Sequence, residues 1–101
     1  MTEMTMKLLL ITYYEAIDME VTELVESAGA QGYTKWTRVI GKGAASGPHF
    51  LTKIWPPGNN VLAVALDDDK ARLLMDKIRA MREKVSALGL KAFLLPVEDV
   101  T

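Results

Sequence analysis

Two nearly continuous apolar stretches limit the folds that this sequence can adopt. Residues 6–14 and residues 61–66 are each long enough for a buried β-strand and short for a buried helix. Alternate side chains of a strand point to opposite faces, so Leu8 and Leu10 lie opposite Leu9, and both sets are apolar. We therefore expect both strands at the centre of a sheet whose two faces are each covered.

Two amphipathic helices are predicted between the strands. Apolar residues recur at spacings of three and four over residues 18–28, and again from Leu74 to Leu88. Asp18 is a suitable N-cap for the first helix, and the aspartates at 67–69 suit the start of the second. A glycine follows the last apolar position of each helix, where a left-handed residue commonly ends it.

The order of these elements predicts the fold. Residues 33–40 are rich in β-branched and aromatic side chains, and residues 92–95 form a short apolar run, so both are expected to be strands. The resulting order β-α-β-β-α-β is that of an α+β, ferredoxin-like sandwich with a four-stranded antiparallel sheet and two helices on one face. Residues 1–101 then form a single domain, in which 1–5 are expected to be disordered and 41–60 form a long loop or extended hairpin between the second and third strands.

Two helices can cover only one face of such a sheet. The second apolar face therefore needs a partner chain, unless the loop at 41–60 folds back over it. We take self-association as the leading expectation.

Charge and composition narrow the function classes. With 12 basic and 13 acidic residues the formal net charge is −1, so nucleic acid is not an expected partner. The absence of cysteine excludes disulfides and thiolate chemistry. The apolar runs are too short for a signal peptide or membrane span, which predicts a cytoplasmic protein without direct membrane insertion. No nucleophile–base pair or cofactor fingerprint is present, so we do not expect an enzyme.

The segment 41–60 is the part of the chain that packing does not explain, and a long loop in a small domain commonly carries function. Gly41, Lys42 and Gly43 open it, and Ser46 and Gly47 follow. Glycines let backbone N–H groups approach an anion, and a lysine adds positive charge. A hairpin whose glycines only permit tight turns explains the same residues equally well.

His49, the only histidine, lies in the same segment. One histidine cannot close a zinc site, but Glu15, Glu98 or further copies of His49 in an oligomer supply additional ligands. The predicted metal-binding pair is His49 and Glu15. A histidine that hydrogen-bonds the loop backbone is the structural alternative.

The sequence resembles the PII-like signalling superfamily over about residues 6–98. The resemblance rests on the element order, on residues 29–34 (GAQGYT) leading into the second strand, and on residues 39–43 (VIGKG), which are similar to the V-x-G-x-G step into that family's T-loop. Three features of nitrogen-regulatory and nucleotide-binding members are missing. These are the modified tyrosine, the glycine-rich phosphate-binding loop and the paired arginines after the last strand.

The resemblance implies a homotrimeric regulatory or sensor protein with ligand sites in the clefts between subunits. Its T-loop, here 41–60, changes shape with ligand and docks on a membrane transporter or regulated enzyme. The missing phosphate-binding loop argues against sensing of ATP or ADP, and a small anion, a nucleotide or a metal ion stays open as ligand. The alternative function is a divalent or transition metal-ion-binding PII-like protein of metal homeostasis or efflux. The expected ligand-binding residues are Thr34, Gly41, Lys42, Gly43, Ser46 and Gly47, and the expected partner-contacting residues are His49, Phe50 and Trp55.

Overall fold

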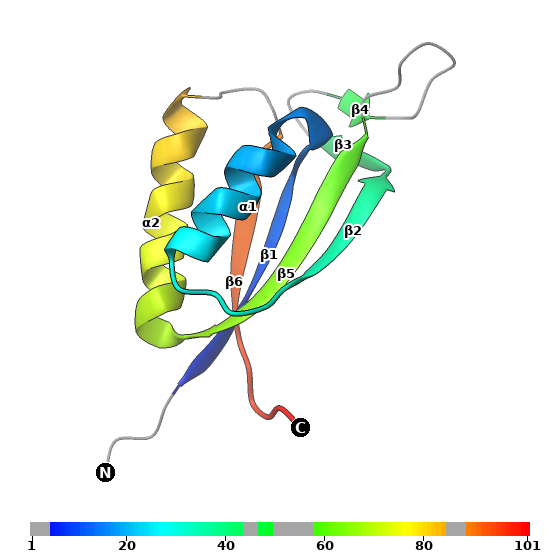
Figure 1. The fold of residues 1–101 in the computed structure, drawn as a ribbon. Coiled ribbons are helices and arrows are strands. Elements are labelled where there is room, and N and C mark those ends of the chain that lie inside the picture. The colour runs from blue at the N-terminus through cyan, green and yellow to red at the C-terminus, as the bar shows by residue number, and fades with distance from the viewer. Residues whose placement is uncertain (1–4, 44–46, 50–57, 85–88) are drawn as a thin grey trace.

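The computed structural model describes residues 5–43, 47–49, 58–84 and 89–101. These residues form strands, one 3-10 turn and two α-helices (Figure 1). In chain order they are β1 (Met6–Tyr14), the turn η1 (Glu15–Ile17), α1 (Asp18–Ser27), β2 (Thr34–Val39), β3 (Gly41–Gly43), β4 (Gly47–His49), β5 (Asn59–Asp67), α2 (Asp68–Lys84) and β6 (Lys91–Pro96).

The main sheet has the strand order β2-β5-β1-β6, and each neighbouring pair is antiparallel. Helices α1 and α2 lie side by side on one face of it (Figure 1). Strands β3 and β4 form a separate two-stranded ribbon. The predicted α+β, ferredoxin-like fold is therefore confirmed, and part of the predicted loop forms an extended hairpin.

The core lies between the sheet and the two helices. Leu9 and Ile11 of β1 and Leu62 of β5 are fully buried there, because their positions alternate onto the face that the helices cover. The helices contribute the apolar stripes that the sequence periodicity predicts. Their core residues are Val21, Val25, Ala71, Leu74 and Ile78.

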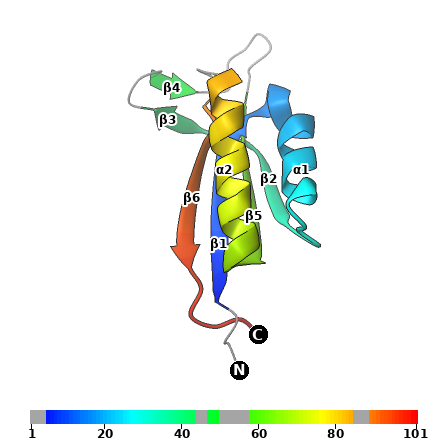
Figure 2. The same ribbon diagram turned by 90° about the vertical axis from the view of Figure 1, so that its left-hand side faces the viewer.

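The other face of the sheet is also apolar, but the described residues do not cover it with a helix. Leu10 lies there with Ala63 and Phe93 as its cross-strand neighbours. Phe93 is 53% exposed and Trp36 of the edge strand β2 is 50% exposed. Figure 2 shows the β3–β4 ribbon at one end of the sheet, on the side away from α1. We call this surface, formed by Leu8, Leu10, Trp36, Val61, Ala63, Phe93 and Leu95, the open face.

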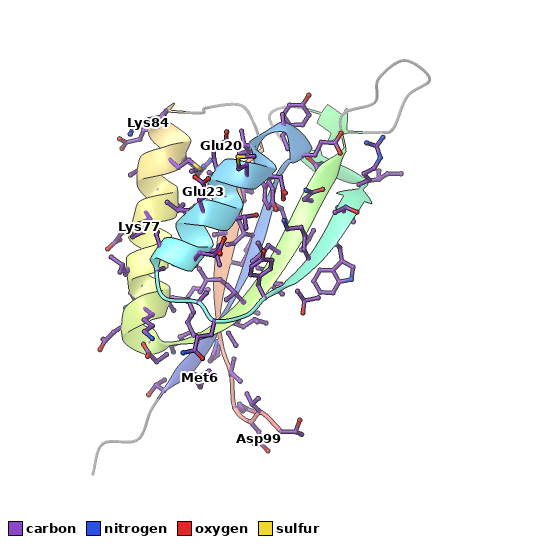
Figure 3. The ribbon with its side chains drawn as sticks, in the orientation of Figure 1. Met6, Glu20, Glu23, Lys77, Lys84 and Asp99 are labelled. Atoms are coloured by element: carbon purple, nitrogen blue, oxygen red, sulfur yellow. The ribbon has the colours of Figure 1, made fainter. Side chains whose placement is uncertain are left out.

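The outward surface of the helix layer has a different character. Glu20 and Glu23 project from α1, and Lys77 and Lys84 from α2 (Figure 3). Both glutamates and Lys84 are exposed, as expected for the solvated sides of amphipathic helices. Among the described residues no helix has the length and apolarity needed to cross a lipid bilayer.

The helix ends agree in part with the predictions. Asp67 caps α2, because its Oδ1 accepts a hydrogen bond of 3.0 Å from the backbone N–H of Lys70. Gly29 follows α1 with φ of +93°, the left-handed conformation expected of a helix-ending glycine. Asp18 is not the N-cap of α1. Ile17 occupies that position without a side-chain cap, and the Asp18 carboxylate has other partners, described below. The predicted last turn of α2, residues 85–88, lies outside the described residues.

Replacing Leu62 with alanine should lower the free energy of unfolding by about 2–5 kcal/mol, because a fully buried side chain leaves a cavity between β5 and the helices. Urea denaturation at a fixed protein concentration measures the change. The control is Leu73→Ala on α2, a residue 47% exposed, for which a change of about 0.5 kcal/mol or less is expected. Equal effects of the two substitutions would contradict the assignment of the core.

Candidate functional site

The candidate site lies where the chain leaves and re-enters the main sheet around residues 41–57. We call this region the loop root and define it by Glu15, Arg38, Gly58 and Asn60. The pairing of β2 with β5 shifts register between Trp36 and Val39, which marks a β-bulge. Within the bulge Arg38 has φ of 55°, the only positive φ among the described non-glycine residues. Left-handed backbone is uncommon for such a residue, so the surrounding contacts must hold it.

The Asn60 side chain holds this backbone. It is only 4% exposed, its Oδ1 accepts a hydrogen bond of 3.1 Å from the Arg38 N–H, and its Nδ2 donates one of 3.1 Å to Asp18 Oδ1. A buried amide with both ends engaged avoids the penalty of an unsatisfied polar group. Asn60 therefore joins the first residue of α1 to the bulge of β2.

Asp18 is the centre of a polar cluster that it forms with Tyr13, Lys35 and Asn60. Tyr13 donates its hydroxyl to Asp18 Oδ1 at 2.6 Å, and Lys35 Nζ lies 3.0 Å from Oδ2. Lys35 also donates to Thr22 Oγ1 at 3.1 Å. Burial opposes ionisation of Asp18, but the hydrogen bonds from Tyr13, Lys35 and Asn60 outweigh it and lower the pKa of this carboxyl. Burial, and then the bond to Asp18, raise the pKa of the Tyr13 hydroxyl well above its ordinary value.

Glu15 contacts both sides of the loop root. Its carboxylate oxygens accept hydrogen bonds of 3.0 and 3.1 Å from Arg38 Nη1. Its backbone N–H donates to the carbonyl of Gly58 at 2.9 Å. The Arg38 and Glu15 side chains are 46% and 29% exposed, so this ion pair contributes about 0–1 kcal/mol to stability.

The structure brings together only some of the predicted ligand-binding residues. Gly41, Lys42 and Gly43 form β3, and Gly47 belongs to β4 and pairs with Gly43. Thr34 begins β2 at the opposite end of that strand, roughly 20 Å from Gly41 at about 3.3 Å per residue. One chain alone therefore does not combine Thr34 with the ribbon. The predicted residues Ser46, Phe50 and Trp55 lie outside the described residues.

The predicted metal pair of His49 and Glu15 stays a prediction, because the His49 side chain lies outside what the structure describes. Glu15 pairs with Arg38, and the backbone of His49 pairs with Gly41 in the β3–β4 ribbon. Within the described ranges no group of three or more histidine, cysteine, aspartate or glutamate side chains is arranged to hold a metal ion.

Sequence reasoning missed the roles of Arg38, Asn60 and Asp18. One signal was present in the pattern. Tyr13 continues the alternation of Leu9 and Ile11, so the sequence pattern places the Tyr13 hydroxyl on the core face near the end of β1. Asn60 likewise is in phase with the core positions of β5. Polar groups at such positions require buried partners, and these two residues are cross-strand neighbours.

The fold and the loop root define a class of protein: a ferredoxin-like domain in which a ribbon leaves the sheet between its second and third strands. The family model that matches the chain is that of the nitrogen regulatory protein P-II, over residues 6–101. The chain belongs to the P-II family, as the sequence resemblance indicated. Members of this family are regulatory proteins, which supports the prediction that the chain is not an enzyme.

Solved structures of PII-like proteins have the same fold. CPII from Thiomonas intermedia K12 bound to ADP and bicarbonate is 22% identical, with a TM-score of 0.75 over 92% of this chain and 86% of that chain. CPII bound to ADP, AMP and acetate is 19% identical, with a TM-score of 0.72 over 100% of this chain and 94% of that chain. A protein from Thermus thermophilus assigned to the PII-like signalling proteins is 21% identical, with a TM-score of 0.66 over 93% of this chain and 88% of that chain. Comparison with curated proteins finds no match.

The lowered pKa of Asp18 predicts a specific acid sensitivity. A carboxyl whose folded pKa is depressed stabilises the protein above its unfolded pKa, near 3.8, and this contribution is lost as the pH falls through the folded value. Asp18→Asn should therefore lower the free energy of unfolding by about 1 kcal/mol at neutral pH, since the carboxylate is partly exposed.

The difference between wild type and Asp18→Asn should then shrink as the pH is lowered below 3.8, which urea denaturation at a series of pH values measures. The control is Asp76→Asn, which removes an exposed ion pair with Arg79 on α2. A constant difference at all pH values would show that the carboxylate charge of Asp18 does not stabilise the fold.

Proposed function

We propose that the chain is the subunit of a homotrimeric, cytoplasmic PII-like regulatory protein. It binds a small ligand in the clefts between subunits and signals to a partner protein through residues 41–60. The observation that carries the proposal is the open face, an apolar sheet surface that the described residues do not cover with a helix, in a P-II family member whose loop root lies at one end of that sheet.

The open face supports a trimer because its residues suit a packed interface. One apolar row crosses three strands and consists of Leu10, Ala63 and Phe93. A neighbouring pair, Leu8 and Leu95, extends the apolar surface along β1 and β6. The helix surface on the other side of the sheet carries charges and is suited to water (Figure 3). Packing the sheets around a common axis therefore buries the apolar surface and leaves the helices outside.

Assembly also supplies what one chain lacks at the ligand site. Thr34 and the glycines of the ribbon are too far apart within a subunit, so a shared cleft is the arrangement in which both contribute. We propose Thr34, Gly41, Lys42, Gly43, Ser46 and Gly47 as the ligand-binding residues. Although this chain lacks the glycine-rich phosphate-binding loop, we propose an adenine nucleotide with a small anion as the ligand class, because CPII, which has the same fold, binds ADP with bicarbonate or acetate.

The signalling surface in this proposal lies within residues 41–60, which the loop root joins to the main sheet. We propose that His49, Phe50 and Trp55 contact a partner, which the family resemblance indicates to be a membrane transporter or a regulated enzyme. Because Glu15, Arg38 and Asn60 connect this segment to the ends of β1, β2 and β5, a ligand bound beside it changes the partner surface through short connections.

Sedimentation tests the trimer directly. Wild type should sediment at about three times the chain mass of 11.2 kDa, and Phe93→Asp should shift it toward the monomer, because the carboxylate loses its water on assembly. Phe93 is half exposed in the single chain, so the substitution leaves the core intact. Leu73→Asp on the outer side of α2 is the control and should remain trimeric. A monomeric wild type would overturn the proposal.

Thermal-shift measurements test the ligand site. ADP with bicarbonate should raise the melting temperature of wild type. A ligand at a hundred times its Kd increases the free energy of unfolding by about 2.7 kcal/mol. Gly41→Ala should weaken this shift, because a methyl group stands where the ligand approaches the backbone. The added Cβ meets Asn59 Nδ2 at 3.5 Å, an ordinary contact, so the variant folds.

Gly32→Ala is the matched control for Gly41→Ala, since nothing lies within 4 Å of its added Cβ. The same screen contains Zn, Cu, Ni and Co ions. Stabilisation by one of these metals that is lost in His49→Ala, with no response to nucleotide or anion, would replace the proposal with the metal-binding alternative.

A further inference from the structure

Trp36 is an aromatic side chain of the open face that takes no part in the core. It belongs to β2, an edge strand of the main sheet, and its side chain is half exposed. The centre of the open face lies over β1 and β5, so Trp36 is at the rim of this surface. In the proposed trimer, packing of the sheets around an axis buries their centres, and the clefts between subunits begin at this rim.

Thr34 lies beside Trp36 on the same face. The two residues are separated by one position of β2, and their partners in β5 are Ala63 and Val61, so both side chains point to the open face. Their Cα atoms are roughly 7 Å apart, because a strand rises about 3.3 Å per residue. An indole next to a hydroxyl suits a flat heterocycle, which stacks on the ring and hydrogen-bonds to the hydroxyl.

The neighbouring Tyr33 ring is engaged on the other side of the strand. Lys35 Nζ lies 5.6 Å from the centroid of this ring, and the same ammonium group bonds Asp18 and Thr22 of α1. The lysine therefore keeps the tyrosine ring on the helix side of β2. Of these two aromatic residues, Trp36 is the one that faces the proposed cleft.

The chain offers less to the phosphates of a nucleotide than to its base. Residues 85–90, between α2 and β6, contain a single glycine and no basic residue. A loop that binds phosphate depends on exposed backbone N–H groups and on basic side chains. Lys42 is the one basic residue of the proposed ligand-binding set. Most of the binding energy at such a site has to come from the ring system of the ligand.

We infer that Trp36 stacks on the base of the nucleotide beside Thr34, and that the site recognises the purine ring rather than the phosphate chain. The inference rests on the proposed function and adds a residue and a specificity to its ligand site. Stacking of a base on an aromatic side chain changes affinity by a factor of about five to a hundred. Stacking does not depend on the number of phosphates, so adenosine, AMP and ADP should bind with affinities within about tenfold of one another.

Fluorescence titration of the trimer tests the inference in the variant Trp55→Phe, in which Trp36 is the only indole. Adenosine, AMP and ADP should each quench the Trp36 emission, whereas pyrophosphate, which lacks a ring, should not. Calorimetric titration with ADP then compares wild type with two variants. Trp36→Leu should weaken ADP binding about fivefold or more, and Trp36→Phe, which keeps an aromatic ring, should weaken it less.

The matched control is Tyr33→Leu, which removes the aromatic ring on the helix side and should leave ADP affinity unchanged. Unchanged ADP affinity in trimeric Trp36→Leu, unchanged Trp36 emission on ADP binding, or ADP affinity more than about tenfold above that of adenosine would overturn the inference alone. Loss of the trimer in Trp36→Leu would overturn it as well, because the indole would then serve assembly. A monomeric wild type, or a trimer that binds none of these compounds, overturns the proposed function.

Discussion

The antiparallel pairing of β1 with β5 is the interaction on which the rest of the structure depends. It runs from the Met6–Asp67 pair to the Tyr14–Asn59 pair without a shift in register. This register places Leu9 opposite Val64 on the side that the helices cover. A slip of one residue would turn every core side chain of one strand to the other face, so burial of the core selects this register.

The same register creates the polar cluster at the end of the core. Tyr13 and Asn60 are cross-strand partners on the buried side, and both bond Asp18 at the start of α1. Among the described residues no buried side-chain nitrogen or oxygen lacks a hydrogen-bond partner. The apolar core therefore ends in a satisfied hydrogen-bond network, and the left-handed Arg38 is held at its edge.

Our proposal gives separate roles to two parts of the molecule. In this proposal the open face is the surface for assembly, while the loop root joins the ribbon to the ends of three strands. Assembly and ligand response are linked in our proposal because the cleft exists only between subunits. The charged surface of the helices lies on the opposite side of the sheet from the open face (Figure 3).

Much of the fold was predictable from local patterns. The periodicities of residues 6–14 and 61–66 indicated the central strands and their two apolar faces, and the glycine and aspartate signals located helix ends. The predicted bounds of β1 equal the observed ones, and those of β2, β5 and β6 differ by one or two residues, as for β5, which begins at Asn59. The residues assigned by family resemblance to ligand and partner contacts remain predictions.

The sequence by itself determined the order of the elements, the apolar faces and the family, because these depend on short-range periodicity and short motifs. Only the tertiary structure decided what Asp18 and Glu15 do. Asp18 was predicted as a helix cap but bonds Asn60, 42 residues away, and Glu15 pairs with Arg38, 23 residues away. The prediction that Glu15 is a metal ligand stays a prediction. Strand register and the bulge in β2 bring these groups together, and no local pattern encodes the distance between residues so far apart in the chain.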